Sequence, residues 1–84
     1  MEIDRIKRII AESNDLSKLG KDRQALKLLD DAIANAVREN QAGWVTLLTR
    51  HASVITDHIG DFNLAKQYLA QGRSQKSAPF TRLR

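Results

Sequence analysis

Apolar residues recur every three or four positions along most of this chain, which is the spacing of one face of an α-helix. The clearest stripe follows Gly20 and comprises Ala25, Leu28, Leu29, Ala32, Ile33, Ala36 and Val37. It predicts a helix that runs to about Glu39, with an apolar face too wide for one neighbouring helix. We therefore expect the rest of the chain to pack against this segment.

Three further stretches show the same periodicity. The stripe over residues 3–19 consists of Ile3, Ile6, Ile9, Ile10, Leu16 and Leu19. The stripe that begins at Gln41 or Trp44 consists of Trp44, Leu48, Ala52, Ile55 and Ile59. A shorter stripe consists of Phe62, Leu64, Ala65, Tyr68 and Leu69 and fades by Gly72. The pattern predicts four helices and no strand.

Glycine and asparagine separate these stretches. Gly20 and Gly60 are predicted to end the first and third helices, because glycine accepts the left-handed conformation of many helix C-termini. Asn40 and Gly43 mark the middle break. Asp22 and Asp61 are expected to cap the second and fourth helices, since a carboxylate can accept the unpaired amides of the first turn.

Composition limits the class of protein. The 84 residues, 42% of them hydrophobic, are enough for one domain, predicted over residues 1–72 with hairpins at about 3–39 and 41–72. The chain has no cysteine, which excludes disulfides and thiolate metal sites and favours a reducing, cytoplasmic location. It shows neither a signal peptide nor an apolar run long enough to span a membrane. We expect a soluble protein.

The net charge of +4 is confined to one end of the chain. Residues 1–72 contain ten basic and ten acidic side chains, whereas residues 73–84 contain Arg73, Lys76, Arg82 and Arg84 and no acidic residue. Pro79 disfavours helical dihedral angles in the residue before it. Residues 73–84 are therefore predicted to form a basic, disordered tail.

The two glycine breaks belong to a longer self-similarity with an offset of 40 residues. Five residues after Gly20 and Gly60 stand alanines, nine after them leucines, twelve after them small residues, and seven before them serines. The matched pairs are Ala25 and Ala65, Leu29 and Leu69, Ala32 and Gly72, and Ser13 and Ser53.

This arrangement resembles the tetratricopeptide repeat, in which two antiparallel helices pack closely at alanine and glycine positions. The resemblance covers about residues 6–72, and residues 60–69, GDFNLAKQYL, match it best. It implies an all-α fold of two stacked helical hairpins. The 40-residue period exceeds the usual 34, Glu12 stands at a position that is usually apolar, and Thr49 and Thr56 replace large residues. A plain four-helix bundle and a microtubule-interacting-and-transport type three-helix bundle stay open as alternatives.

Catalytic motifs are absent from the sequence. His51 and His58 are seven residues apart on one predicted helix, roughly 10.5 Å, which is too far to share a metal ion. There is no zinc-protease motif, no phosphate loop and no nucleophile with a base at a recognisable spacing. We expect neither enzymatic activity nor a cofactor.

The resemblance implies a protein-binding function, because the first helix of each tetratricopeptide hairpin lines a concave face. The residues that this places on the concave face are Lys7, Ile10, Asn14, Lys18, Leu47, Arg50, His51, Val54 and His58. Apolar anchors flanked by cations suit a peptide with acidic character. An adaptor, scaffold or assembly function is therefore expected.

Two other interactions follow from the sequence. Two repeats without a capping helix leave an apolar outer face, so we expect self-association, as a homodimer or in a larger assembly, through Leu64, Tyr68 and Leu69. As an alternative, the four cations of the tail could bind nucleic acid or another acidic surface, with Phe80 stacking on a base.

Overall fold

The computed structural model describes residues 3–82, with side chains described as far as Arg73, and folds them into four helices. Helix α1 spans Ile3–Lys18, α2 spans Asp22–Arg38, α3 spans Ala42–His58 and α4 spans Phe62–Arg82. No strand occurs within residues 3–82. The predicted all-α fold class is confirmed, and the first three helices end within one residue of their predicted bounds.

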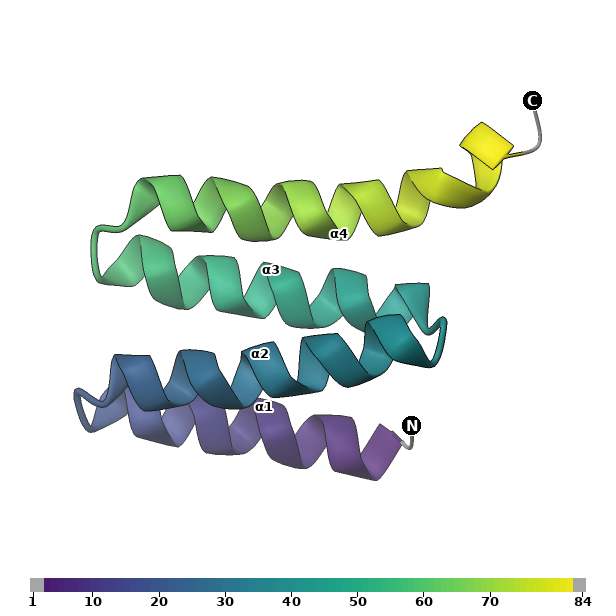
Figure 1. The fold of residues 1–84 in the computed structure, drawn as a ribbon. Coiled ribbons are helices and arrows are strands. Elements are labelled where there is room, and N and C mark those ends of the chain that lie inside the picture. The colour runs from purple at the N-terminus through teal and green to yellow at the C-terminus, as the bar shows by residue number, and fades with distance from the viewer. Residues whose placement is uncertain (1–2, 83–84) are drawn as a thin grey trace.

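The helices form a row in which each runs antiparallel to the one before it (Figure 1). Helix α2 packs on α1 and α3, and α3 packs on α4. Helix α1 also contacts α3, whereas α1 and α4 have no backbone contact over the part of the chain that is described. The arrangement is therefore an open stack, in contrast to a closed bundle in which the first and last helices meet.

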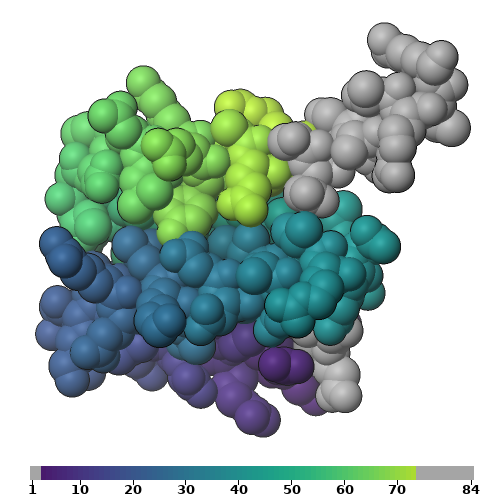
Figure 2. Space-filling model, viewed as in Figure 1, coloured from purple at the N-terminus to yellow at the C-terminus, as the bar shows by residue number. Residues whose placement is uncertain are grey.

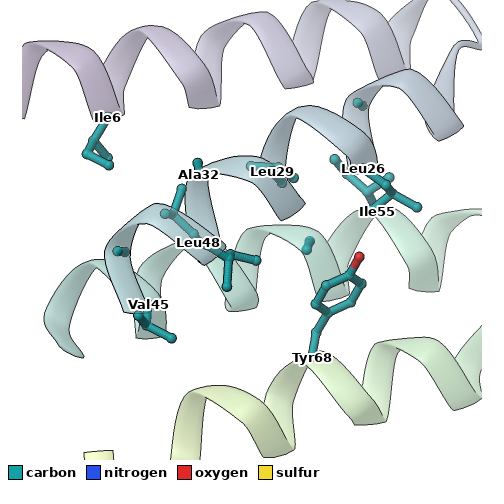
Figure 3. Close-up of a cluster of buried hydrophobic side chains, with 12 residues drawn as sticks. Ile6, Leu26, Leu29, Ala32, Val45, Leu48, Ile55 and Tyr68 are labelled. Carbon is teal, nitrogen blue, oxygen red and sulfur yellow. The ribbon is translucent and has the colours of Figure 1, made fainter. Parts of the chain in front are cut away.

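The core lies between α2 and its two neighbours, as the width of the α2 stripe predicts. Its residues from α2 are Ala25, Leu26, Leu29, Ala32, Ile33 and Ala36, all buried. They meet Ile6 of α1 and Val45, Leu48, Ala52 and Ile55 of α3 in one cluster (Figure 3). The sequence pattern missed Leu26 and Val45. It also placed Ile59 in the core, but this side chain is exposed.

The three turns share one geometry. Gly20, Asn40 and Gly60 all have positive φ, at 79°, 57° and 88°. The next residue in each turn donates its amide to the carbonyl five residues earlier, at 2.8 Å in all three cases. This bond satisfies a carbonyl that the end of the helix leaves free. The predicted breaks at these three residues are confirmed, whereas Gly43 lies inside the first turn of α3.

One of the two predicted caps is wrong. The N-cap of α2 is Lys21, which makes no side-chain capping bond, and Asp22 is already helical. The Asp22 carboxylate instead accepts a 2.7 Å hydrogen bond from the Ser17 hydroxyl across the turn. Asp61 does cap α4, because its carboxylate accepts the backbone amide of Leu64 at 3.1 Å.

Small hydroxyl side chains form the α3 surface that faces α4. Thr49, Ser53 and Thr56 are buried, and each donates its hydroxyl to a backbone carbonyl one turn earlier in α3. Each of these three buried hydroxyls therefore has a hydrogen-bond partner. An unpaired buried hydroxyl would lower the stability of the fold. This explains why threonines replace large residues in α3: here α4 packs close to the α3 backbone.

Gly72 lies where α4 packs tightly on α3. A Cβ placed on it would lie 2.5 Å from Oγ1 of Thr49, so only glycine fits this position without rearrangement. The sequence interpretation placed the end of the fourth helix at about Gly72, whereas α4 continues to Arg82. The tail predicted to be disordered, residues 73–84, is thus helical as far as Arg82, and residues 83–84 lie outside the described residues.

We expect Gly72→Ala to lower the free energy of unfolding, by about 1–2 kcal/mol, because overpacking at Thr49 outweighs the helix propensity of alanine. Gly43→Ala is the matched control: its Cβ meets nothing within 4 Å, so it should raise stability by up to about 1 kcal/mol. Urea denaturation measures both variants. The double variant Gly72→Ala with Thr49→Ala should recover part of the lost stability. Equal stabilisation by Gly72→Ala and Gly43→Ala would contradict this packing.

Candidate partner-binding surface

Two apolar side chains of α3 are exposed, whereas its other apolar side chains are buried or half-buried. Leu47 is 41% exposed and Val54 is 59% exposed. They are seven residues apart, so they lie two turns along one face of the helix. Both were predicted to bind a partner, and their exposure leaves them free to contact one.

The predicted residues of α1 lie on the helix that contacts α3. Lys7, Asn14 and Lys18 are exposed. Ile10 is half-buried and packs against the core. The structure thus leaves three polar side chains of α1 exposed to solvent, while Ile10 packs partly against the hydrophobic core.

The predicted residues of α3 do not gather in one hollow. Leu47 lines a hollow with Gln41, Gly43 and Trp44. Arg50 lines another with residues of α4, among them Leu69 and Arg73. Val54 lines a third, also shared with α4. Arg50 and Val54 therefore border α4, and His58 is exposed in the last turn of α3.

His51 was predicted to lie on the concave face, but its side chain is less accessible than this prediction implies. Its side chain is half-buried, and its Nε2 atom is buried without a hydrogen-bond partner among the described residues. Burial lowers the pKa of His51 below its usual 6.5, because desolvation disfavours the charged imidazolium. The imidazole is therefore neutral at pH 7 and adds no cation to this surface.

The residues predicted for self-association occupy different environments. Tyr68 is only 7% exposed, and its hydroxyl donates a 2.6 Å hydrogen bond to Oδ1 of Asp30 on α2. Figure 3 shows its ring pointing from α4 into the core. Leu64 is half-buried against the same core. The outward placement of Tyr68 is thus wrong, and Leu69, 41% exposed, is the member of the set that faces solvent.

Phe62 is a surface residue that the sequence interpretation placed in the fourth apolar stripe. It is 60% exposed and lines the same hollow as Val54 and Leu69. The sequence contained an indication that Phe62 is exposed. It lies 40 residues after Asp22, so a position that is polar in the first hairpin is aromatic in the second.

The described residues contain no group of three or more side chains suited to hold a metal ion. None of the described helices has the length and apolar character needed to cross a membrane. A scan against family models finds no match, and searches among curated proteins and solved structures find no significant one.

Acidification should destabilise the fold through His51. Its pKa is lower in the folded chain than in the unfolded chain, so the unfolded state binds the proton first as the pH falls. Stability is then fully present above about pH 7 and declines as the pH drops through about 6.5. His51→Gln should reduce this decline, measured by urea denaturation between about pH 7.5 and pH 5.5. An equally steep decline in this variant would contradict the assignment.

The Tyr68 hydroxyl links α4 to α2 through its hydrogen bond to Asp30. Tyr68→Phe keeps the ring and removes the bond to Asp30, so we expect a loss of about 1 kcal/mol in unfolding free energy. Burial, together with the bond to the Asp30 carboxylate, raises the pKa of Tyr68, and the phenol stays protonated at neutral pH. Asp31→Asn, next to Asp30 in sequence, is the matched control and should change stability little. No loss in Tyr68→Phe would show that this bond is not stabilising.

Proposed function

We propose that this chain is a non-catalytic protein–protein interaction module built from two tetratricopeptide-like hairpins, α1–α2 and α3–α4. The observation that carries the proposal is the exposure of Leu47 and Val54 on α3, a helix whose remaining apolar side chains pack inward. Exposed apolar residues in a polar surround are typical of protein interaction sites.

The two hairpins repeat several details of geometry, which supports the repeat interpretation. Ser13 and Ser53 are both buried, and each donates its hydroxyl to the carbonyl three residues earlier, at 2.8 and 2.7 Å. The turn bonds match too, from Lys21 to Leu16 and from Asp61 to Thr56, both at 2.8 Å, although the turn after α2 has the same bond. The two serines are related by the 40-residue offset, and α2 has no counterpart of them, since Ile33 takes the intermediate position. A plain bundle gives no reason for this alternation.

The direct contact between α1 and α3 supports the concave face as the binding site. In a tetratricopeptide-like stack, the first helices of successive hairpins lie side by side and form that face. Here they would present Leu47 together with Lys7, Asn14 and Lys18, all exposed. The ligand that suits them is a peptide or helix with an apolar anchor and acidic neighbours.

The proposed role is adaptor, scaffold or assembly factor. It needs no cofactor, and the absence of cysteine fits the reducing cytoplasm. The two histidines do not argue for catalysis, since His51 is half-buried and His58 lies two turns away, roughly 10.5 Å, along the same helix.

Leu47→Glu should abolish partner binding on this face without unfolding the chain, because the side chain is already substantially exposed. Affinity capture from the native lysate, followed by mass spectrometry, should show at least about tenfold less of the bound partner. Leu19→Glu is the matched control, since Leu19 is 70% exposed in the turn after α1. Equal capture by Leu47→Glu and the wild type would contradict the concave-face proposal.

A further inference from the structure

A shallow groove runs along the outer side of the second hairpin, between α3 and α4. Its first hollow, about 260 Å³, is lined by Ser53, Val54, Asp57, Phe62, Ala65, Lys66 and Leu69. Its second, about 240 Å³, is lined by Thr46, Thr49, Arg50, Leu69, Gly72 and Arg73. Leu69 lines both, so the two hollows are adjacent. We call this the α3/α4 groove.

The first hollow is mainly apolar and uncovered. Three of the side chains that line it, Val54, Phe62 and Leu69, are each more than two-fifths exposed. Each hollow is smaller than the roughly 300–1,000 Å³ of a small-molecule pocket. A row of hollows this size instead suits single side chains along one face of a helix.

The first hairpin shows what covers the corresponding surface. There, the face of α2 carries Leu26 and Leu29, which α3 helps to bury in the core. The residues 40 positions later on α4 are Lys66 and Leu69. Leu29 is fully buried, whereas Leu69 is exposed because no helix follows α4 over the described chain. The α3/α4 groove is thus the counterpart of a surface that a helix occupies elsewhere in the same molecule.

The substitutions on α4 also indicate the charge of the occupant. Lys66 replaces Leu26, and Arg73 replaces Ile33, at the same offset. From Phe62 to Arg82, the sequence of α4 contains Lys66, Arg73, Lys76 and Arg82 and no acidic residue. Arg50 of α3 adds a further cation beside Leu69, and Asp57 is the one acidic side chain among those that line the two hollows. An occupant with acidic flanks would be complementary.

We propose that the α3/α4 groove binds an acidic amphipathic helix from another protein. Its apolar stripe would rest on Val54, Phe62 and Leu69, and its carboxylates would face Lys66 and Arg50. The groove shares Val54 with the exposed residues of the proposed function. Leu47 and the α1 residues of the concave face lie outside it, so its occupation does not depend on that face. In helix-in-groove binding of this kind, the groove contacts apolar side chains at every third or fourth position of the bound helix.

A second copy of the chain does not fit this charge requirement. Helix α1 carries four basic and three acidic residues, α2 three of each, α3 one of each, and α4 only basic ones. No helix of this chain is therefore net negative. A single-stranded nucleic acid meets the charge requirement and could stack a base on Phe62, but it offers no apolar stripe for Val54 and Leu69.

The test uses a synthetic helical peptide of about five turns, with leucine at every third or fourth position and glutamate on the remaining face. A matched peptide carries lysine in place of glutamate. Fluorescence anisotropy with the full chain should show binding of the acidic peptide, weakening with salt, and at least about tenfold weaker binding of the lysine peptide. Failure of the acidic peptide to bind, or equal binding of both, overturns the proposal.

Variants locate the site. Phe62→Ser with Leu69→Ser, and separately Lys66→Glu, should each weaken binding of the acidic peptide at least about tenfold. Leu19→Ser and Arg8→Glu change an exposed leucine and an exposed cation elsewhere and should leave it unchanged. Unaltered binding in the groove variants overturns the proposal.

Two further measurements identify the competing occupants. Sedimentation that shows a dimer of the wild type but a monomer of Phe62→Ser would assign the groove to a second copy. Displacement of the acidic peptide by a single-stranded oligonucleotide would assign it to nucleic acid. Leu47→Glu should keep full affinity for the acidic peptide, so failure of the concave-face proposal and failure of this one are distinguishable.

Discussion

The structure depends on one helix that is buried from two sides. Helix α2 packs on both α1 and α3, and three alanines, Ala25, Ala32 and Ala36, are almost completely buried in its stripe. Small side chains let the backbones of neighbouring helices approach closely, so dispersion contacts are dense. Because α1 and α3 use the same helix, they are brought near enough to touch each other. The candidate binding face on α1 and α3 is a consequence of this shared packing.

The turns impose the antiparallel order that makes such sharing possible. Their positive-φ residues, Gly20, Asn40 and Gly60, recur every 20 residues, and the same hydrogen bond closes each turn. Turn chemistry alone therefore repeats with every helix and does not distinguish a hairpin repeat from a simple succession of helices. The buried serines support the proposed hairpin repeat, because Ser13 and Ser53 lie in α1 and α3, while Ile33 takes the intermediate position in α2. The support for a 40-residue unit therefore comes from packing more than from turns.

Periodicity and glycine positions were enough to predict the four helices and their breaks, because both are local properties of the chain. What the sequence could not predict depends on which neighbour a residue meets. Gly72 looked like a helix end but is a contact with Thr49, and Tyr68 looked like a surface anchor but reaches Asp30 on α2. Arg50 was placed with α1 and borders α4 instead. Each of these outcomes is set by residues far away in sequence, which a helical wheel does not contain.

The interface between α3 and α4 differs in chemistry from the interfaces of α2 with α1 and α3. Figure 2 shows the side chains of α2, α3 and α4 packed against one another on the face in view. The described part of α4 nevertheless buries only Ala65, Tyr68 and Gly72. Against them α3 offers Thr49, Ser53 and Thr56, whose hydroxyls bond to their own helix. Burial of apolar area therefore holds α4 less strongly than it holds α2, and a helix with less buried area opens at lower free energy. A helix bound along Val54, Phe62 and Leu69 would contact α3 and α4 together and add apolar burial at the interface that has least of it. Binding there would stabilise the second hairpin as well as recruit a partner.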